Sequence, residues 1–300
     1  MATHFLAECL ATPWALQPER LTAYAAFLAR RYYGEHDAPA PSVAAGPPAA
    51  RRQRAVGGPA RSGSIAVVPV YGTIMQRSSQ INVCDGGTST EAIAKGISDA
   101  NADESISAIL LDVDSPGGSV YGVAELAAQI RASAKPVYGI ANSLAASAGY
   151  WLLSQCAEVY VTPGGEVGSI GVWQAHQDLS KALSDAGVAV SLISAGKYKV
   201  EGNPYGPLGS DAKAFMQSRV DDYYGAFTRD VAKGRKTSTE AVRGRMGEGR
   251  VLGADAAKAA GMVDGVMTMD QLVRHIQLRE QAAGQSARRA LARAQLRRLA

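Results

Sequence analysis

The chain has 300 residues, 47% hydrophobic and 19% charged, a balance typical of a globular protein rather than a disordered or membrane-embedded one. Its 32 glycines indicate many turns and close backbone approaches rather than a helical bundle. The net charge of +4 excludes a strongly basic folded groove, because the arginines of residues 51–61 and of the tail beyond residue 278 contribute more than that total. Nucleic acid is therefore not expected as a partner beyond contacts of the basic tail.

Cysteine content and hydropathy indicate in which cellular compartment the protein is expected. Cys9, Cys84 and Cys156 are odd in number and widely spaced, so they predict neither a disulfide framework nor a zinc site. This pattern favours a reducing, cytoplasmic compartment. No window approaches the roughly 18 uninterrupted apolar residues of a membrane span. We expect a chain without a membrane span, a metal or a cofactor.

Four regions follow one another along the chain. Residues 1–36 are predicted as an N-terminal helical segment, because residues 13–34 have apolar side chains at helical spacing. Residues 37–63 are rich in Ala, Pro, Gly and Arg, which predicts a disordered linker. Residues 64–278 are predicted to form the folded domain, and residues 279–300 a basic tail rich in Ala and Arg, forming a loosely held helix.

Strands and helices alternate from residue 64 onward. Residues 64–71 read as a strand, and residues 106–113 are an almost continuous run of Ile, Leu, Val and Ala, which is typical of a buried parallel strand. The pattern further predicts a helix capped at 88–91, a helix over 120–133, a strand over 136–141, a helix after 147, a strand over 158–162, a helix over 179–186, a strand over 188–194, and helices from 210 and 237. This order predicts an α/β fold with a helical C-terminal part.

The first motif that could support chemistry is D-V-D-S-P-G-G-S, at the end of the strand over 106–113. Gly117 and Gly118 would let backbone amides approach a ligand and point outward as anion donors. An ordinary tight turn is the competing interpretation. Asp112 and Asp114 could form a metal pair, but no other ligand cluster accompanies them, so a turn cap is favoured.

The second motif is N-S-L-A-A-S-A-G-Y, with Ser147 among small residues between a strand and a helix. The Ser147 hydroxyl would lie at a helix start, beside backbone amides that have no acceptor within the helix. In isolation such a pattern is more often a packing surface of small residues. It differs from the G-x-S-x-G nucleophile motif, because Ala145 replaces the first glycine.

The third motif is S-A-G-K-Y-K, in which Lys197 and Lys199 follow the apolar strand predicted over 188–194. Burial lowers the pKa of a lysine, so that a desolvated amine can accept the proton of a serine near neutral pH. Serine–lysine pairs are an alternative to the serine–histidine arrangement. If the strand continues, both lysines share one face, and geometry does not separate them.

These three motifs, in this order, resemble peptidase family S49, which includes signal peptide peptidase A and phage head-maturation proteases. The resemblance spans about residues 64–270 and adds G-S-I-G-V at 168–172 and G-R-V-L-G-A-D-A-A-K-A-A-G-M-V-D at 249–264. Each motif alone is weak, but their conjunction is specific. The resemblance implies a ClpP/crotonase-like α/β core built from repeated ββα and βαβ units.

The resemblance also implies roles for individual residues. Ser147 would be the nucleophile and Lys199 the general base, because Lys199 matches the family's G-x-x-K pattern whereas Lys197 occupies its variable position. The backbone N–H of Gly117 or Gly118, together with that of Ala148, would form the oxyanion hole. Residues 168–172 would pair with the peptide substrate as an added strand. These residues are Gly168, Ser169, Ile170, Gly171 and Val172.

His176 is the alternative base. ClpP, which shares the fold, uses a histidine that also follows its serine by a few tens of residues. Here His176 lies in Q-A-H-Q-D, where an exposed position at a helix start is the simpler interpretation.

The expected function is that of a serine endopeptidase of phage or prophage capsid assembly. It would cleave scaffold or capsid proteins as a homo-oligomer, in the host cytoplasm or the prohead. A degradative protease like signal peptide peptidase is the first alternative. An acyl-CoA enzyme of the crotonase type would share the glycines but have no use for Ser147 and Lys199, and an inactive structural subunit of the prohead would need none of the motifs.

Overall fold

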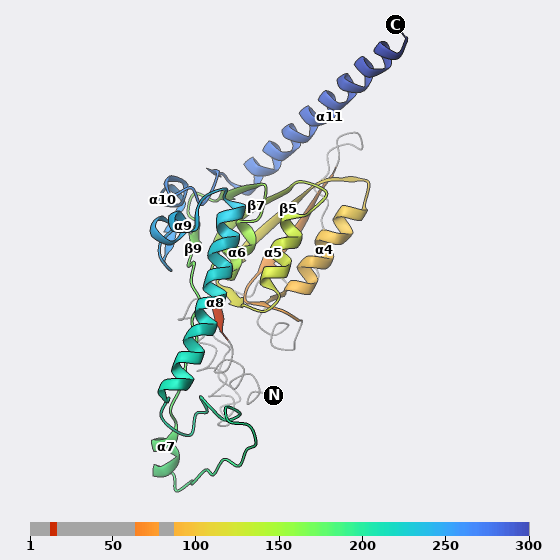
Figure 1. Ribbon diagram of the computed structural model, residues 1–300. Helices are drawn as coiled ribbons and strands as arrows, with labels where there is room; N and C mark the ends of the chain where they lie inside the picture. The colour runs from red at the N-terminus through yellow and green to blue at the C-terminus, as the bar shows by residue number, and fades with distance from the viewer. Residues whose placement is uncertain (1–12, 17–63, 78–86, 300) are drawn as a thin grey trace, which may run out of the picture.

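The computed structural model describes residues 13–16, 64–77 and 87–299 (Figure 1). The linker expected over 37–63 lies outside the described residues. So does most of the expected N-terminal helical segment, of which only residues 13–16 can be compared with the structure.

A seven-stranded sheet forms the centre of the molecule, in the order β10-β9-β7-β5-β2, with β8 beside β7 and β11 beside β8. All neighbours run parallel except β10 and β9. β7 pairs with β8 along its first half and with β9 along its second half, so the sheet splits within β7, between Ala141 and Leu144. The strands are β2 (Ser64–Tyr71), β5 (Ile106–Ser115), β7 (Val137–Ala146), β8 (Glu158–Val161), β9 (Glu166–Gly168), β10 (Val251–Gly253) and β11 (Gly265–Val266).

Helices cover both faces of this sheet. α4, α5, α6 and α8 enclose the larger apolar cluster on one face (Figure 1). On the other face, Leu272 and Ile276 of α11 pack against Leu110 and Ile140. The helices are α4 (Thr90–Ala102), α5 (Val123–Arg131), α6 (Ala148–Leu153), α7 (Ser180–Asp185), α8 (Ser210–Gly234), α9 (Thr239–Arg245), α10 (Ala254–Ala259) and α11 (Met269–Leu299). The α/β class and the helical C-terminal part are confirmed.

A second, smaller sheet has the order β1-β6-β3-β4. Its strands are β1 (Trp14–Leu16), β3 (Ile74–Met75), β4 (Thr88–Ser89) and β6 (Gly117–Ser119). The helix expected over residues 13–34 is therefore wrong at Trp14–Leu16, which pair antiparallel with β6. Edge pairing and burial of all three side chains outweigh the helical spacing of the sequence.

Two helix starts are capped by serines one residue away from the expected position. The Ser89 hydroxyl accepts a hydrogen bond from the Ala92 N–H at 3.1 Å, so α4 begins one residue later than a cap at Thr88 requires. Ser238 caps α9 in the same way. At the C-terminus, α11 runs without a break through the boundary expected between residues 278 and 279.

Residues 174–209, here called the arm, project together with the start of α8 away from the rest of the described domain, here called the body (Figure 1). The strand expected over 188–194 is wrong, because these residues have no β partner and are all exposed. The apolar run predicted burial, but nothing in the described part of this single chain covers it. The helix expected over 179–186 is confirmed as α7. Within the described ranges, no helix combines the length and the hydrophobicity that crossing a membrane requires.

Candidate active site

Ser147 lies at the junction of β7 and α6, in a backbone conformation that a serine rarely adopts. Its φ of 54° and ψ of −119° fall outside the ordinary regions, and its side chain is 1% exposed. Such strain costs about 1–3 kcal/mol and persists only where the surroundings enforce it, often at functional sites. The junction resembles a nucleophile elbow in shape, although the sequence lacks the first glycine of that motif.

Hydrogen bonds from both sides hold the backbone of Ser147. Its N–H donates to the Gly168 carbonyl at 2.7 Å, and its carbonyl accepts from the Trp151 N–H at 2.9 Å. The hydroxyl Oγ is 3.5 Å from the Gly171 carbonyl, which is long for a hydroxyl hydrogen bond. The hydroxyl is thus oriented only weakly, whereas the backbone that carries it is fixed.

The three residues expected to form an oxyanion hole lie around Ser147. Ala148 is the first residue of α6, so its N–H has no acceptor within the helix. Gly117 adjoins the serine, because a Cβ built on Gly117 would lie 2.9 Å from the Ser147 Cβ. The Gly117 N–H, however, donates to the Ser115 hydroxyl at 3.2 Å. Of the two glycines, Gly118 therefore remains the better candidate for a donor toward a ligand.

Gly118 is fixed in place by the small sheet. A Cβ at this position would lie 1.8 Å from the Ile74 carbonyl oxygen, so no larger residue fits without moving β3. Ser115 adds a second restraint, since its hydroxyl donates to the Gly72 carbonyl at 2.6 Å. Gly149 in turn lets the first turn of α6 approach Ser115 closely, with a built Cβ only 3.2 Å away. Gly118 thus allows β6 to lie close to β3, and Gly149 allows α6 to lie close to the end of β5.

The segment expected to bind substrate, residues 168–172, runs along the other side of the serine. Gly168 has a φ of 134° and Ser169 one of 54°, so the chain turns sharply after β9. The Ser169 N–H donates to the Arg250 carbonyl at 2.8 Å, which fixes this turn against the start of β10. Ile170 is buried, whereas Ser169, Gly171 and Val172 are half-buried.

Sequence reasoning missed β1 as part of this site. Trp14 forms an antiparallel bridge with Trp173, and Ala15 pairs with Gly118. One signal was available: Pro13 and Pro18 enclose the segment, and a proline disfavours the helical conformation of the residue before it.

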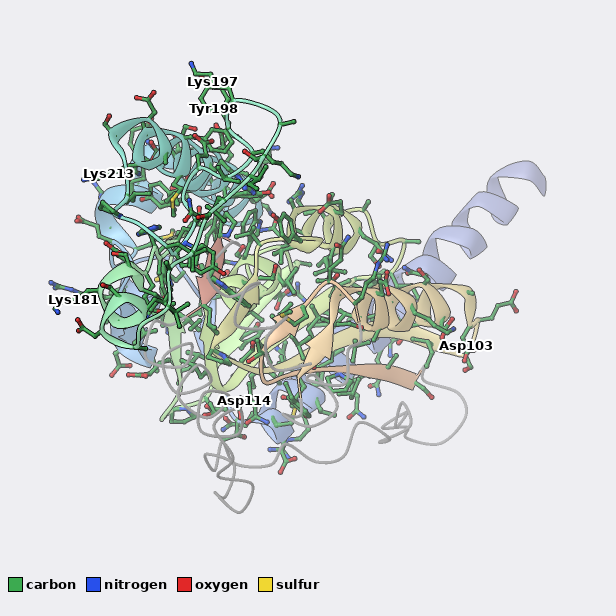
Figure 2. All side chains as sticks on the ribbon, turned by 90° about the horizontal axis from the view of Figure 1, so that it is seen from below. Asp103, Asp114, Lys181, Lys197, Tyr198 and Lys213 are labelled. Atoms are coloured by element: carbon green, nitrogen blue, oxygen red, sulfur yellow. The ribbon has the colours of Figure 1, made fainter. Side chains whose placement is uncertain are left out.

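Lys199 does not lie near Ser147 within this chain. It belongs to the arm and is exposed, as is Lys197. Figure 2 shows Lys197 and Tyr198 at the outer edge of the arm, well separated from Asp114 at the carboxyl end of β5. His176 is also on the arm, where its Nε2 contacts the Asn203 carbonyl at 3.0 Å. The structure therefore assembles Ser147, Ala148, the two glycines and residues 168–172, and places Lys197, Lys199 and His176 on the arm.

The surroundings of Asp112 are those of a structural carboxylate rather than of a metal ligand. The Tyr71 hydroxyl donates to its carboxylate, and burial raises the pKa of the Asp112 carboxyl while this hydrogen bond partly offsets the effect. Among the described residues, no group of three or more His, Cys, Asp or Glu side chains is placed to hold a metal ion.

Comparison with known proteins identifies one family model. The model described as "Peptidase family S49" matches residues 129–283, a range that contains Ser147, residues 168–172 and the arm. Gly117, Gly118 and β1 precede the matched range.

Individual relatives extend the similarity toward the N-terminus. The chain is 34% identical over 253 residues to "Capsid assembly protease C" of Escherichia phage lambda, which covers 83% of this chain and 54% of that protein. It is 35% identical over 224 residues to "Head-tail preconnector protein GP5" of Enterobacteria phage P21, covering 74% and 43%. "Protease 4" of Salmonella typhi is 32% identical over 215 residues, covering 70% and 34%. The chain thus spans about half or less of the length of these relatives.

Proposed function

Because this chain belongs to peptidase family S49, we propose that it is a serine endopeptidase with Ser147 as its nucleophile. The observation that supports this most is the strained backbone of Ser147 at a strand-to-helix junction. That conformation directs the hydroxyl to the carboxyl edge of a parallel sheet, where α/β folds place their ligands. An ordinary packing serine would gain nothing from the strain.

In the proposed reaction, the Ser147 oxygen attacks the carbonyl carbon of the scissile peptide bond. The N–H groups of Ala148 and Gly118 stabilise the negative charge that develops on the carbonyl oxygen. Ala148 contributes the N-terminal amide of α6. Gly118 contributes the second N–H in preference to Gly117, because the Gly117 N–H donates to the Ser115 hydroxyl. The substrate lies in an extended conformation along residues 168–172, as an added strand.

The general base in this proposal is Lys199, supplied by a second copy of the chain. Lys199 is exposed on the arm of its own chain, whereas Ser147 is buried in the body, so one copy alone does not form the pair. The arm and the start of α8 also expose a group of large apolar side chains, which favours burial against another copy. These are Val188, Val190, Leu192, Ile193, Tyr198, Tyr205 and Phe215. A homo-oligomer would cover them and bring a lysine to each serine.

Scaffold or capsid proteins of a phage or prophage are the proposed substrates, and the host cytoplasm or prohead the proposed location. The phage lambda relative, which is named a capsid assembly protease, and the P21 relative, which is named a head-tail preconnector protein, support this. The similarity to Protease 4 supports a protease without a role in capsid assembly as the second candidate.

Ser147→Ala tests the proposed activity. We expect hydrolysis of a casein-type substrate to fall by at least about a thousandfold, because the nucleophile is lost, while the urea unfolding midpoint stays unchanged. Ser98→Ala, an exposed serine on α4, is the matched control and should keep full activity. A folded Ser147→Ala protein that hydrolyses casein as fast as the wild type would refute the proposal.

A further inference from the structure

The chain's own segment Trp14–Leu16 lies in the position that the proposed function gives to the substrate. The three side chains are 1%, 0% and 2% exposed, although they form a short strand separated from the rest of the domain by a long stretch of sequence. On one side β1 pairs with β6, the strand of the oxyanion glycines. On the other side it lies against Trp173, directly after the expected substrate-binding residues.

Backbone hydrogen bonds on this second side are those of an inserted strand. The Trp14 N–H donates to the Trp173 carbonyl at 2.8 Å, and the Trp173 N–H donates back to the Trp14 carbonyl at 3.0 Å. The indole N–H of Trp173 donates to the Leu16 carbonyl at 2.7 Å. Main-chain pairing of this kind is the usual way in which a cleft holds an extended peptide.

The carbonyl group of Ala15 lies close to the serine, next to Gly117. A Cβ built on Gly117 would lie 2.2 Å from the Ala15 carbonyl oxygen, 3.1 Å from its carbonyl carbon and 2.9 Å from the Ser147 Cβ. These atoms therefore surround one small volume, which only a glycine at position 117 leaves open. Ala15 is also the residue opposite Gly118, the favoured oxyanion donor.

We propose that Trp14–Leu16 is a built-in substrate, which the site cleaves between Ala15 and Leu16. The inference rests on the proposed function and extends it to a substrate class. The cleft would select an extended peptide with a small residue before the scissile bond and large apolar residues on either side, as in Trp-Ala-Leu. Ala15 is fully buried within the larger apolar cluster, which leaves little space for a larger side chain.

The bond changes follow those of an ordinary acyl transfer. The Ser147 oxygen bonds to the Ala15 carbonyl carbon while a lysine amine takes the hydroxyl proton. The C–N bond to Leu16 then breaks, and the same proton passes to the leaving Leu16 nitrogen. Water hydrolyses the Ala15 ester in a second step, which releases the peptide ending at Ala15 and restores the serine. The cut separates Trp14 and Ala15 from the rest of the chain, so that they can leave the cleft and another peptide can enter it.

The test uses the full-length protein, with intact mass and N-terminal sequencing as readouts. We expect wild-type protein to acquire a new N-terminus at Leu16, and Ser147→Ala to stay uncut. Ala15→Ser, which keeps a small side chain, should be cut at a rate close to that of the wild type. Ala15→Phe should be cut at least about tenfold more slowly, because overpacking this position displaces the carbonyl group.

A peptide pair keeps the test decisive if Ala15→Phe does not fold. Wild-type enzyme should cleave a synthetic peptide spanning residues 12–20 between Ala15 and Leu16, and should cleave its Ala15→Phe counterpart at least about tenfold more slowly. A protein that hydrolyses casein through Ser147 while its own Ala15–Leu16 bond and the peptide stay intact would overturn the inference and leave the proposed function standing. Loss of all Ser147-dependent hydrolysis would overturn both.

Discussion

At the scale of single residues, the proposed peptide hydrolysis uses two side chains in different surroundings. The body of the domain constrains Ser147 but not Lys199. The serine is buried in a strained backbone conformation, and hydrogen bonds to Gly168 and Trp151 enforce that strain. Lys199 lies on the exposed arm. In the proposed pair, one partner is therefore fixed by the fold of its own chain, and the proposal assigns the positioning of the other to a second copy.

Three lysine and histidine variants distinguish the candidate bases. We expect Lys199→Ala to abolish hydrolysis as completely as Ser147→Ala, because the two groups act as a unit. Lys197→Ala should keep most of the activity, since its ammonium stacks over Tyr198 at 4.7 Å from the ring centre on the exposed arm. His176→Ala should have little effect.

The pH dependence of hydrolysis supports the same distinction. A lysine base requires a rate that rises toward alkaline pH, because only the unprotonated amine accepts the serine proton. A rate that instead rises around pH 6.5, and loses this dependence in His176→Ala, would show that the histidine is the base.

At the scale of secondary structure, α8 packs against α6 and supports it from one side. Trp151 of α6 stacks on Phe227 of α8 with ring centres 4.5 Å apart, and its indole N–H donates to Asp230 at 3.0 Å. Gly234, the last residue of α8, lies so close to Ser154 that a Cβ would be 2.1 Å from the Ser154 carbonyl oxygen. The helix that bears the proposed oxyanion amide therefore depends on this contact.

Gly234→Ala tests the contact. The added methyl group must displace the end of α8, and we expect a loss of about 1–3 kcal/mol in the free energy of unfolding. Gly244→Ala in α9 is the matched control, because its added Cβ would meet no atom within 4 Å. It should change the stability by at most about 1 kcal/mol, in the stabilising direction. Equal urea midpoints for the two variants would contradict the packing described here.

Polar side chains around the carboxylate of Glu158 attach α11 to β8. Glu158 accepts hydrogen bonds from Tyr160 at 2.6 Å and from His275 at 3.0 Å, and it pairs with Arg279. Burial by itself would raise the pKa of Glu158, but these hydrogen bonds and the Arg279 charge lower it below its ordinary value. The ionised carboxylate is thus favoured by the fold.

Glu158→Gln should therefore lower the free energy of unfolding at pH 7 by about 1–2 kcal/mol. Because the folded pKa lies below the unfolded one, this contribution is present above about pH 4.3 and disappears as the pH falls through the folded pKa. Urea unfolding of both proteins at pH 7 and below pH 4 measures it. Glu104→Gln, at an exposed position, is the control. A difference that stays constant with pH would contradict this role of Glu158.

Sequence patterns predicted the elements that carry a clear signal within their own residues. The strands β2 and β5 and the helices α5, α8 and α9 follow from apolar runs, periodicity and capping residues. Ser147 and its glycines followed from motifs. The patterns failed where contacts between distant segments decide: Trp14–Leu16 become a strand through pairing with β6, whereas residues 188–194 pair with no described strand and are exposed.

At the scale of the whole molecule, the body and the arm carry different parts of the proposed site. The body forms a closed core around the central sheet and carries Ser147, the glycines and β1 (Figure 1). The arm carries Lys197 and Lys199 and most of the exposed large apolar side chains. Such a division is expected of a protein whose active site is completed at a subunit interface, because each arm would cover its apolar side chains and deliver its lysine in one step.

The most direct test of this account is complementation between two inactive variants. Ser147→Ala and Lys199→Ala are co-expressed in equal amounts, and casein hydrolysis is compared with that of each variant alone. If the lysine comes from a neighbouring copy, random mixing predicts about a quarter of the wild-type activity per chain, since a working site needs an intact serine and an intact lysine from different copies. Co-expression of Ser147→Ala with the Ser147→Ala/Lys199→Ala double variant is the control and should stay inactive. A mixture as inactive as its two components would contradict the shared site.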